Sequence, residues 1–305
     1  MDSPALETVV RIPWGASLLR TLETFPQHSE VDPDARPSPA IPAVRVSAKG
    51  AVAVLNHLGG GYAPADELRW WLASGDGEPR ASATPYPFAG SRDAVLAIDF
   101  RVDDTGRLTL LEKVANAEGR ASSRLAVVGP TGEVAWKGPL DGGPYLRLVP
   151  DDAGALFLWR GEDHALVPID PRTGQLGAAR PLVLGSRAAV AADRGVVLSA
   201  STSADRIGKP AGIADALVFL FGVDGDDDYY TVSGGELLAV TFAGQVRSRL
   251  ALDGVPALVA AAVGPKEIQA RPAPTASWQV DRVGRVYVPR VTPEELQVVR
   301  VTLPR

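Results

Sequence analysis

Residues 280–288, VDRVGRVYV, contain the pattern that decides the fold of this chain. An apolar strand runs into an Asp-x-x-Gly turn, and a second strand of alternating apolar residues follows. Asp favours such a turn because its carboxylate can bond backbone N–H groups two residues on, and Gly supplies the positive φ. The stretch therefore predicts an antiparallel hairpin.

Copies of this hairpin recur along the chain, at residues 102–110, 149–158 and 192–198, with a weaker copy at 46–54. The turn glycines lie at positions 50, 106, 154, 195 and 284, so the first three steps are 56, 48 and 41 residues. A second hairpin follows most copies, for example at 125–136 and 237–246. Two hairpins per repeat of roughly 40–50 residues predict the four-stranded blades of a β-propeller.

We expect one all-β domain over residues 1–305, with blades at 42–87, 94–141, 144–184 and 187–252 and a fifth blade built from both chain ends. An N-terminal segment such as 16–22 would join the C-terminal strand 296–301, because closure removes an open sheet edge. Residues 26–41 are rich in Pro and predict an extended linker. The last step, of 89 residues, predicts an insertion at 202–235; six blades are the alternative.

The D-x-x-G-x-[LV]-[TY]-[LV] pattern of these hairpins is similar to the repeats of the broad β-propeller group, such as NHL-like, lactonase-like and quinoprotein-like propellers. The resemblance covers most of the chain and implies a fold. It implies no activity, so no active-site residue is transferred from it.

Composition narrows the function classes. The net charge is −5 and the Arg residues are dispersed, so no basic run favours nucleic acid. There is no Cys, which excludes disulfides, thiolate nucleophiles and Cys-ligated zinc. No stretch of eighteen apolar residues or signal peptide is visible, so we expect no membrane span and a cytoplasmic protein, or a secreted one whose signal has been removed.

The acidic stretch 221–230, FGVDGDDDYY, is the candidate metal site. Asp224, Asp226 and Asp228 alternate as at the start of a calcium loop, where carboxylate oxygens converge on one cation. Two departures weaken this hypothesis, because Tyr229 stands where such a loop needs Gly, and Gly235 occupies its twelfth position. The alternative is a solvated acidic hairpin tip. Ca²⁺ is thus the one cofactor that the sequence suggests.

Aromatic and acidic residues give further candidates. Trp70 and Trp71 are adjacent on a predicted strand and point to opposite faces, so one of them is a candidate binding residue. The other Trp residues are expected to pack between blades. A metal ion at the propeller axis would need converging carboxylates, for which Asp99, Asp103 and Asp281 are candidates on innermost strands. The Asp of each Asp-x-x-Gly turn is, however, expected to shape its turn.

Three functions follow as hypotheses. The absence of a catalytic motif favours a non-enzymatic scaffold that binds a protein partner or a ligand. The alternative is a metal-dependent, lactonase-like hydrolase with an axial ion. A carbohydrate-binding propeller is the second alternative, although the Trp residues do not recur at equivalent repeat positions.

Overall fold

The computed structural model describes the strands of the protein and the turns that join many of them. The described residues are 5–13, 43–55, 67–68, 70–73, 80–81, 86–87, 94–115, 121–140, 146–150, 153–160, 163, 165–181, 219–226, 228–233, 235–241, 244–252, 278–291 and 295–304. Among them, no helix is long and apolar enough to cross a membrane.

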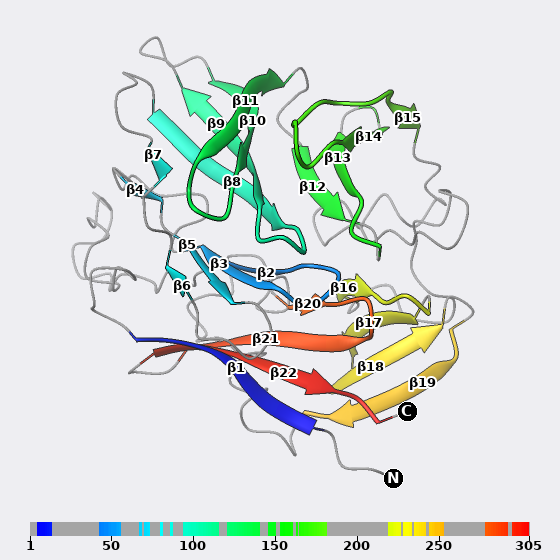
Figure 1. Cartoon of the computed structure of the whole chain (residues 1–305). Coiled ribbons are helices and arrows are strands. Elements are labelled where there is room, and N and C mark those ends of the chain that lie inside the picture. The colour runs from blue at the N-terminus through cyan, green and yellow to red at the C-terminus, as the bar shows by residue number, and fades with distance from the viewer. Residues whose placement is uncertain are drawn as a thin grey trace, which may run out of the picture.

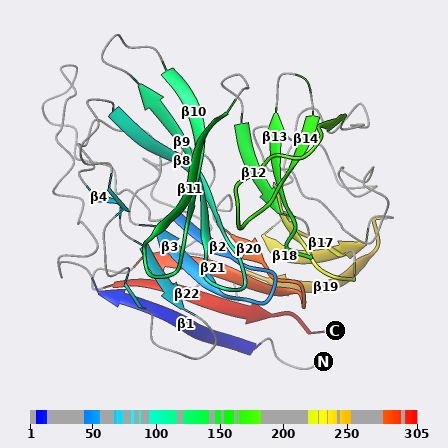
Figure 2. The ribbon, with the colours of Figure 1, turned by 45° about the horizontal axis from the view of Figure 1, so that its top comes forward.

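Five four-stranded antiparallel sheets are arranged in a ring and form a five-bladed β-propeller, as the sequence predicted (Figure 1). The same ring is seen after rotation (Figure 2). In order from the innermost strand, blade one contains β2 (Ala43–Val46), β3 (Val52–Leu55), β5 (Trp70–Ala73) and β6 (Arg80–Ala81). Blade two contains β8 (Ala94–Val102), β9 (Leu108–Ala115), β10 (Ala121–Val128) and β11 (Val134–Leu140). Blade three contains β12 (Leu146–Pro150), β13 (Leu156–Arg160), β14 (Ala165–Ile169) and β15 (Arg180–Pro181).

Blade four contains β16 (Phe219–Val223), β17 (Asp228–Ser233), β18 (Glu236–Thr241) and β19 (Val246–Ala251). Blade five contains β20 (Gln279–Val280), β21 (Arg285–Val291), β22 (Glu295–Thr302) and β1 (Ala5–Pro13). A separate pair is formed by β4 (Glu67–Leu68), which lies between β3 and β5 in the chain order, and β7 (Tyr86–Pro87), which lies between β6 and β8. The innermost strands meet at the centre of the ring, where β2 contacts both β8 and β20.

Both chain ends build blade five, but the closing strand is Ala5–Pro13 and not the expected segment 16–22. β1 runs along the outer edge of β22, in antiparallel register from Ala5 opposite Thr302 to Pro13 opposite Glu295 (Figure 1). Val10 and Ile12 are buried there, which explains why this stretch closes the ring. Residues 16–22 and the expected linker 26–41 lie outside the described residues.

The fourth blade begins later than expected. Its first hairpin is formed by β16 and β17, so residues 219–233 belong to the blade and not to an insertion. The turn between them reads Asp224-Gly225-Asp226-Asp227-Asp228 and has Asp in the fourth position, where the other clear copies have Gly. That departure hid the repeat. The earlier part of the expected insertion and the copy at 192–198 lie outside the described residues.

The core consists of apolar side chains packed between neighbouring blades. Phe100, Leu108 and Leu110 of blade two pack against Ala53 and Leu55 of blade one. Trp278 is fully buried between blades four and five, and Trp159 is 3% exposed, as expected of Trp residues that pack between blades. These interfaces fix the innermost strands and hence the turns that they carry.

Candidate functional site

The first hairpin turn of three blades is built in the same way around an aspartate. Oδ1 of Asp103 accepts bonds from the backbone N–H of Thr105 and Arg107, at 2.8 and 2.9 Å. Asp224 and Asp281 accept equivalent bonds from the residues two and four positions later. The predicted role of the Asp-x-x-Gly aspartates as turn formers is therefore confirmed for Asp103 and Asp281.

Hydrogen bonds between turns link four neighbouring blades. Gly225 of blade four donates its N–H to the carbonyl of Arg282 in blade five, at 2.8 Å. Arg282 donates in turn to the carbonyl of Ala48 in blade one, at 2.9 Å. Lys49 then donates its N–H to Oδ1 of Asp104 in blade two, at 2.9 Å. The turns thus form a continuous arc at one face of the propeller.

In blades four and five a tyrosine completes the turn. Tyr230 donates its hydroxyl to Oδ2 of Asp224 at 2.9 Å, and Tyr287 donates to Oδ2 of Asp281 at 3.0 Å. Burial of Tyr287, and then the negative charge of Asp281, raise the pKa of this hydroxyl to about 12. Both Asp-Tyr pairs are buried between blades.

The glycine of the next turn packs directly on each Asp-Tyr pair. A Cβ added at Gly284 would lie 2.3 Å from the Tyr230 hydroxyl, and one at Gly50 would lie 2.5 Å from that of Tyr287. Both glycines also have positive φ, of 82° and 90°. These positions therefore need glycine for conformation and for space. Sequence analysis missed this unit, although its signal is visible as tyrosine six residues after the turn aspartate.

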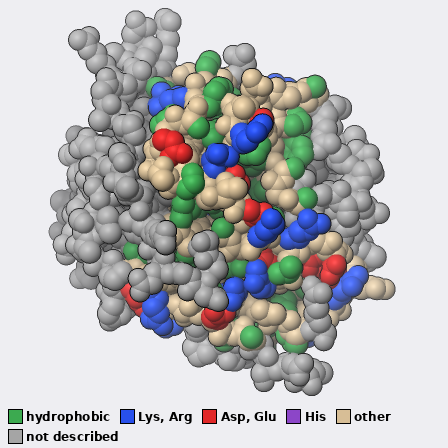
Figure 3. Space-filling view, viewed as in Figure 1, with side chains coloured by type: hydrophobic (Ala, Val, Ile, Leu, Met, Phe, Trp, Pro, Cys, Tyr) green, Lys and Arg blue, Asp and Glu red, His purple; other side chains and the backbone are tan. Residues whose placement is uncertain are grey.

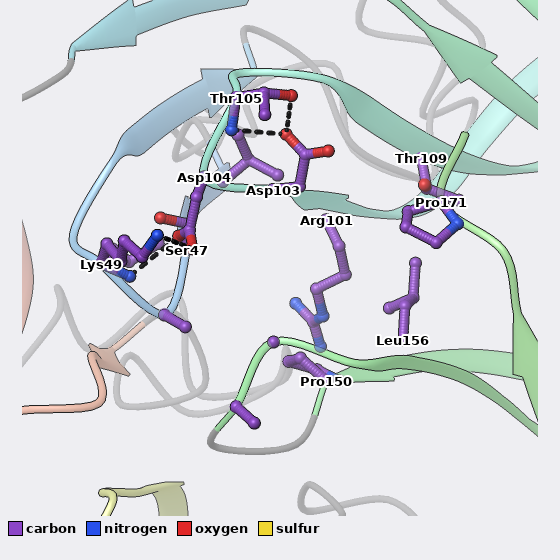
Figure 4. A pocket seen from close by; sticks show the side chains of 15 residues that line it. Ser47, Lys49, Arg101, Asp103, Asp104, Thr105, Thr109, Pro150, Leu156 and Pro171 are labelled. Atoms are coloured by element: carbon purple, nitrogen blue, oxygen red, sulfur yellow. Dashed lines mark hydrogen bonds and ion pairs between the residues drawn. The ribbon is translucent and has the colours of Figure 1, made fainter.

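Blade two departs from this plan and leaves a pocket. Thr109 stands six residues after Asp103, where the other two blades have tyrosine. The pocket has a volume of about 320 Å³ and lies among the first hairpins of blades one, two and three (Figure 4). Thr109 lines it, together with Val46, Pro150 and Leu156 as apolar walls. The side chain at this position is thus smaller than the tyrosine of blades four and five.

Arg101, Asp104 and Lys49 supply charged groups to the pocket (Figure 4). Arg101 is the second-last residue of the innermost strand β8, and Asp104 is the second residue of the turn that follows. Oδ2 of Asp104 lies 3.7 Å from Nζ of Lys49, and the Asp104 side chain is 30% exposed. A carboxylate and a guanidinium therefore border one space that also has apolar walls.

Asp99 pairs with the guanidinium groups of Arg45 and Arg101, and Arg101 is the one that lines the pocket. The Asp99 side chain is buried, accepts a bond from Nη2 of Arg45 at 3.0 Å and lies 3.8 Å from Nη1 of Arg101. It also accepts the backbone N–H of Leu148, at 2.9 Å, across the interface with blade three. Burial opposes ionisation, but Arg101 and then Arg45 hold the pKa of Asp99 below its ordinary value. Asp99 is thus an anion among arginines.

The Arg101 side chain is 19% exposed and lies near other charged groups. Burial is the first cause that lowers its pKa, to about 10; Asp99 opposes this shift, while Arg45 and Arg147 add to it. Arg101 consequently remains protonated at neutral pH. Its Nε donates to the carbonyl of Leu148 at 2.9 Å, which fixes its direction. Figure 3 shows that basic and acidic side chains lie side by side near the middle of one face of the molecule.

The structure gives the candidate calcium ligands individual roles. Asp224 receives the turn N–H groups and the Tyr230 hydroxyl. Asp226 is exposed, and Asp228 lies 2.9 Å from Nε of Arg247. Within the described residues, no group of three His, Cys, Asp or Glu side chains is placed to hold a metal ion. The spacing of these aspartates is thus accounted for by a hairpin turn.

Trp70 and Trp71 lie on β5, the third strand of blade one, opposite Leu55 and Val54 of β3. Their side chains lie outside the described part of the structure, so their proposed role in binding stays a prediction.

Comparison with protein-family models and with curated proteins finds no match. Solved structures do show similarity. One is a protein of unknown function from Bacteroides caccae, with 13% identity and a TM-score of 0.38, covering 68% of this chain and 80% of that chain. Another is a glutaminyl cyclase from Myxococcus xanthus, with 13% identity and a TM-score of 0.39, covering 98% and 97%. A third is the apo form of the soluble aldose sugar dehydrogenase from Escherichia coli, with 12% identity and a TM-score of 0.46, covering 99% and 100%.

Two of these three structures are enzymes, which runs against the expectation of a non-enzymatic scaffold. That hypothesis rested on the absence of a catalytic motif in the sequence. A propeller gathers polar groups from separate blades, so a site of this kind leaves no contiguous motif. The identities are too low for any activity to be transferred from these proteins.

Proposed function

We propose that the protein is a propeller hydrolase that cleaves a small ester or lactone in the pocket between the first hairpins of blades one to three. The observation that carries the proposal is that Asp104 and Arg101 border the same pocket, of about 320 Å³. This volume suits a small molecule.

The chemistry assigned to these residues is acyl transfer to water. Asp104 is proposed to act as the general base, because its carboxylate is partly exposed at the pocket and Lys49 lies beside it. Arg101 is proposed to stabilise the oxyanion that develops on the carbonyl carbon's oxygen, since a fixed cation in a partly buried site is effective there. Asp104 takes a proton from water as the water oxygen bonds to the carbonyl carbon. The ester C–O bond then breaks, the leaving alkoxide takes that proton from Asp104, and the acid product releases its own proton to solvent as it becomes a carboxylate.

Hydrogen bonds position both groups before a substrate arrives. Oδ1 of Asp104 is held by the backbone N–H of Lys49, which leaves Oδ2 for water. Nε of Arg101 is held by the Leu148 carbonyl. Each group is thus fixed by a neighbouring blade, so the propeller closure itself sets their separation.

The test is hydrolysis of a panel of short-chain esters and of five- and six-membered lactones, followed by acid release at constant pH. Asp104→Asn keeps the acceptor for Lys49 and removes the base, so kcat should fall about 100-fold or more. Asp163→Asn is the matched control, since Asp163 is an exposed carboxylate paired with Arg160 elsewhere on blade three. Absence of turnover on the whole panel, or an unchanged kcat in Asp104→Asn, would refute the proposal.

A further inference from the structure

A bulge in β8, the innermost strand of blade two, turns Asp99 towards blade three. The register of β8 with β9 shifts between Ala97 and Asp99, so that Asp99 lies opposite Leu111. Directly opposite residues of an antiparallel pair share a face of the sheet, and Leu111 packs against blade three. Without the extra residue, Asp99 would lie opposite Leu110, which packs against blade one. The bulge therefore decides that Asp99, and Arg101 two residues later, face blade three.

Asp99 and Arg101 bind the backbone of one residue in blade three. Oδ2 of Asp99 accepts the N–H of Leu148, at 2.9 Å. Nε of Arg101 donates to the carbonyl of the same residue, also at 2.9 Å. Asp99 thus holds in place the residue whose carbonyl fixes the direction of the Arg101 guanidinium.

Asp99 also supplies the negative charge beside two guanidinium groups. Its Oδ1 accepts a bond from Nη2 of Arg45 at 3.0 Å and lies 3.8 Å from Nη1 of Arg101. The side chains of Asp99, Arg45 and Arg101 are 4%, 12% and 19% exposed, so water screens their charges only weakly. Without the carboxylate, the two guanidinium groups would repel each other and Arg101 would lose its counter-charge.

Arg101 keeps one part of its guanidinium for the pocket that it lines (Figure 4). Nε and Nη1 donate to the carbonyls of Leu148 and Phe100, whereas Nη2 makes no hydrogen bond within the described residues. A donor stabilises a transition state only if it points to the place where the charge develops. Whatever fixes Nε and Nη1 therefore also fixes the direction of Nη2.

We infer that Asp99 is the positioning residue for Arg101: it holds the guanidinium in the direction that stabilises the oxyanion, and it does not touch the substrate itself. The inference deepens the proposed function and rests on it for its effect on the rate. Loss of the Asp99 charge should lower kcat more than it changes KM, because the oxyanion develops only in the transition state.

The test is a double-mutant cycle, with kcat and KM measured on the ester or lactone that the protein cleaves best. Asp99→Asn keeps the volume of the side chain and removes its charge, so kcat should fall at least about tenfold while KM changes less than about threefold. Arg101→Gln should lower kcat at least as much. The double variant should be no slower than Arg101→Gln alone, because Asp99 acts through Arg101.

Asp163→Asn is the matched control, because it removes the charge of an exposed aspartate that pairs with Arg160. It should leave kcat unchanged. Effects of Asp99→Asn and Arg101→Gln that multiply in the double variant, or an unchanged kcat in Asp99→Asn, would overturn the inference.

NMR measurement of the arginine Nε–H groups tests the positioning without turnover. Exchange of the Arg101 Nε–H with solvent should be at least about tenfold slower than that of Arg11, whose side chain is 60% exposed. Asp99→Asn should remove most of this difference, whereas a merely structural role would lower the melting temperature and leave the exchange of the folded protein unchanged. Equal exchange of Arg101 and Arg11 in the wild-type protein would overturn the inference, even if Asp99→Asn did not fold.

The two measurements separate this inference from the proposed hydrolysis. If esters are cleaved with a kcat that depends on Arg101, but the two effects multiply, the inference fails and the hydrolase stands. If no ester or lactone is cleaved and the exchange rates follow the expected pattern, the proposed hydrolysis fails, and Asp99 remains the residue that positions Arg101 in the pocket.

Discussion

The first hairpin turns of blades four and five differ from that of blade two, although in all three an aspartate at the equivalent position accepts the backbone N–H groups of the turn. In blades four and five, Tyr230 and Tyr287 fill the space beside the turn and bond its aspartate. In blade two, Thr109 occupies the equivalent position and a pocket lies there. The comparison teaches that the residue six positions after the turn aspartate is a tyrosine that bonds the aspartate in two blades and a threonine that lines a pocket in the third.

The largest effect on stability is expected between blades four and five, where a tyrosine fills the space beside the turn. Gly284→Ala should lower the free energy of unfolding by about 3 kcal/mol, because a Cβ there would strain a positive φ and overlap the Tyr230 hydroxyl. Gly235→Ala is the matched control, since Gly235 also has positive φ but nothing lies within 4 Å of its added Cβ. It should cost about 1 kcal/mol. Denaturant unfolding of both variants measures the difference, and equal losses would show that contact with the Asp-Tyr pair contributes nothing.

The pocket is tested by making the first turn of blade two resemble those of blades four and five. Thr109→Tyr should place a hydroxyl near Asp103 and fill the pocket, so ester hydrolysis should fall at least about tenfold while the protein still folds. Thr109→Val keeps the size of the side chain and should retain the activity. Full activity in Thr109→Tyr would mean that the pocket is not the site.

A smaller effect is expected from removing one hydroxyl. Tyr287→Phe should lower the free energy of unfolding by about 1 kcal/mol at neutral pH, because it removes a buried hydrogen bond to Asp281.

The same hydroxyl should make stability depend on alkaline pH. Its pKa in the folded protein, about 12, lies above its ordinary value near 10. The folded state therefore binds more protons than the unfolded state in this window, and the stabilisation, present below pH 10, is lost as pH rises towards 12. Tyr287→Phe should flatten that part of the stability profile. An identical decline in both proteins would contradict the assignment.

The smallest effect is expected from calcium. Asp224 is occupied by the turn and by Tyr230, so adding Ca²⁺ after EDTA should shift the melting temperature by less than about 1 °C. A rise of several degrees that Asp226→Asn removes would restore Asp224, Asp226 and Asp228 as a calcium loop.

Much of the fold could be predicted from the hairpins alone. The spacing of Gly50, Gly106 and Gly154 predicted the first three blades, and closure by both chain ends followed from the need to cover a sheet edge. The closing strand was assigned to 16–22 instead of 5–13, because both N-terminal segments mix apolar and polar residues. The hairpin of blade four was missed because its turn lacks the marker glycine.

The candidate site was much less predictable. Asp99 was identified as an innermost-strand acid, but its surroundings were not, since Arg45 is 54 positions away in the chain. Arg101 and Asp104 carried no motif, because their partners Leu148 and Lys49 come from other blades.

The sequence by itself determined the repeat, the β-propeller and the chemistry of each turn, because hairpins are local and depend on residues close together in the chain. Only the tertiary structure decided which turns meet, that Arg45 and Arg101 pair with Asp99 and that Thr109 lines a pocket. The physical reason is that each of these features lies between blades, where residues far apart in sequence are brought together by ring closure and by apolar packing.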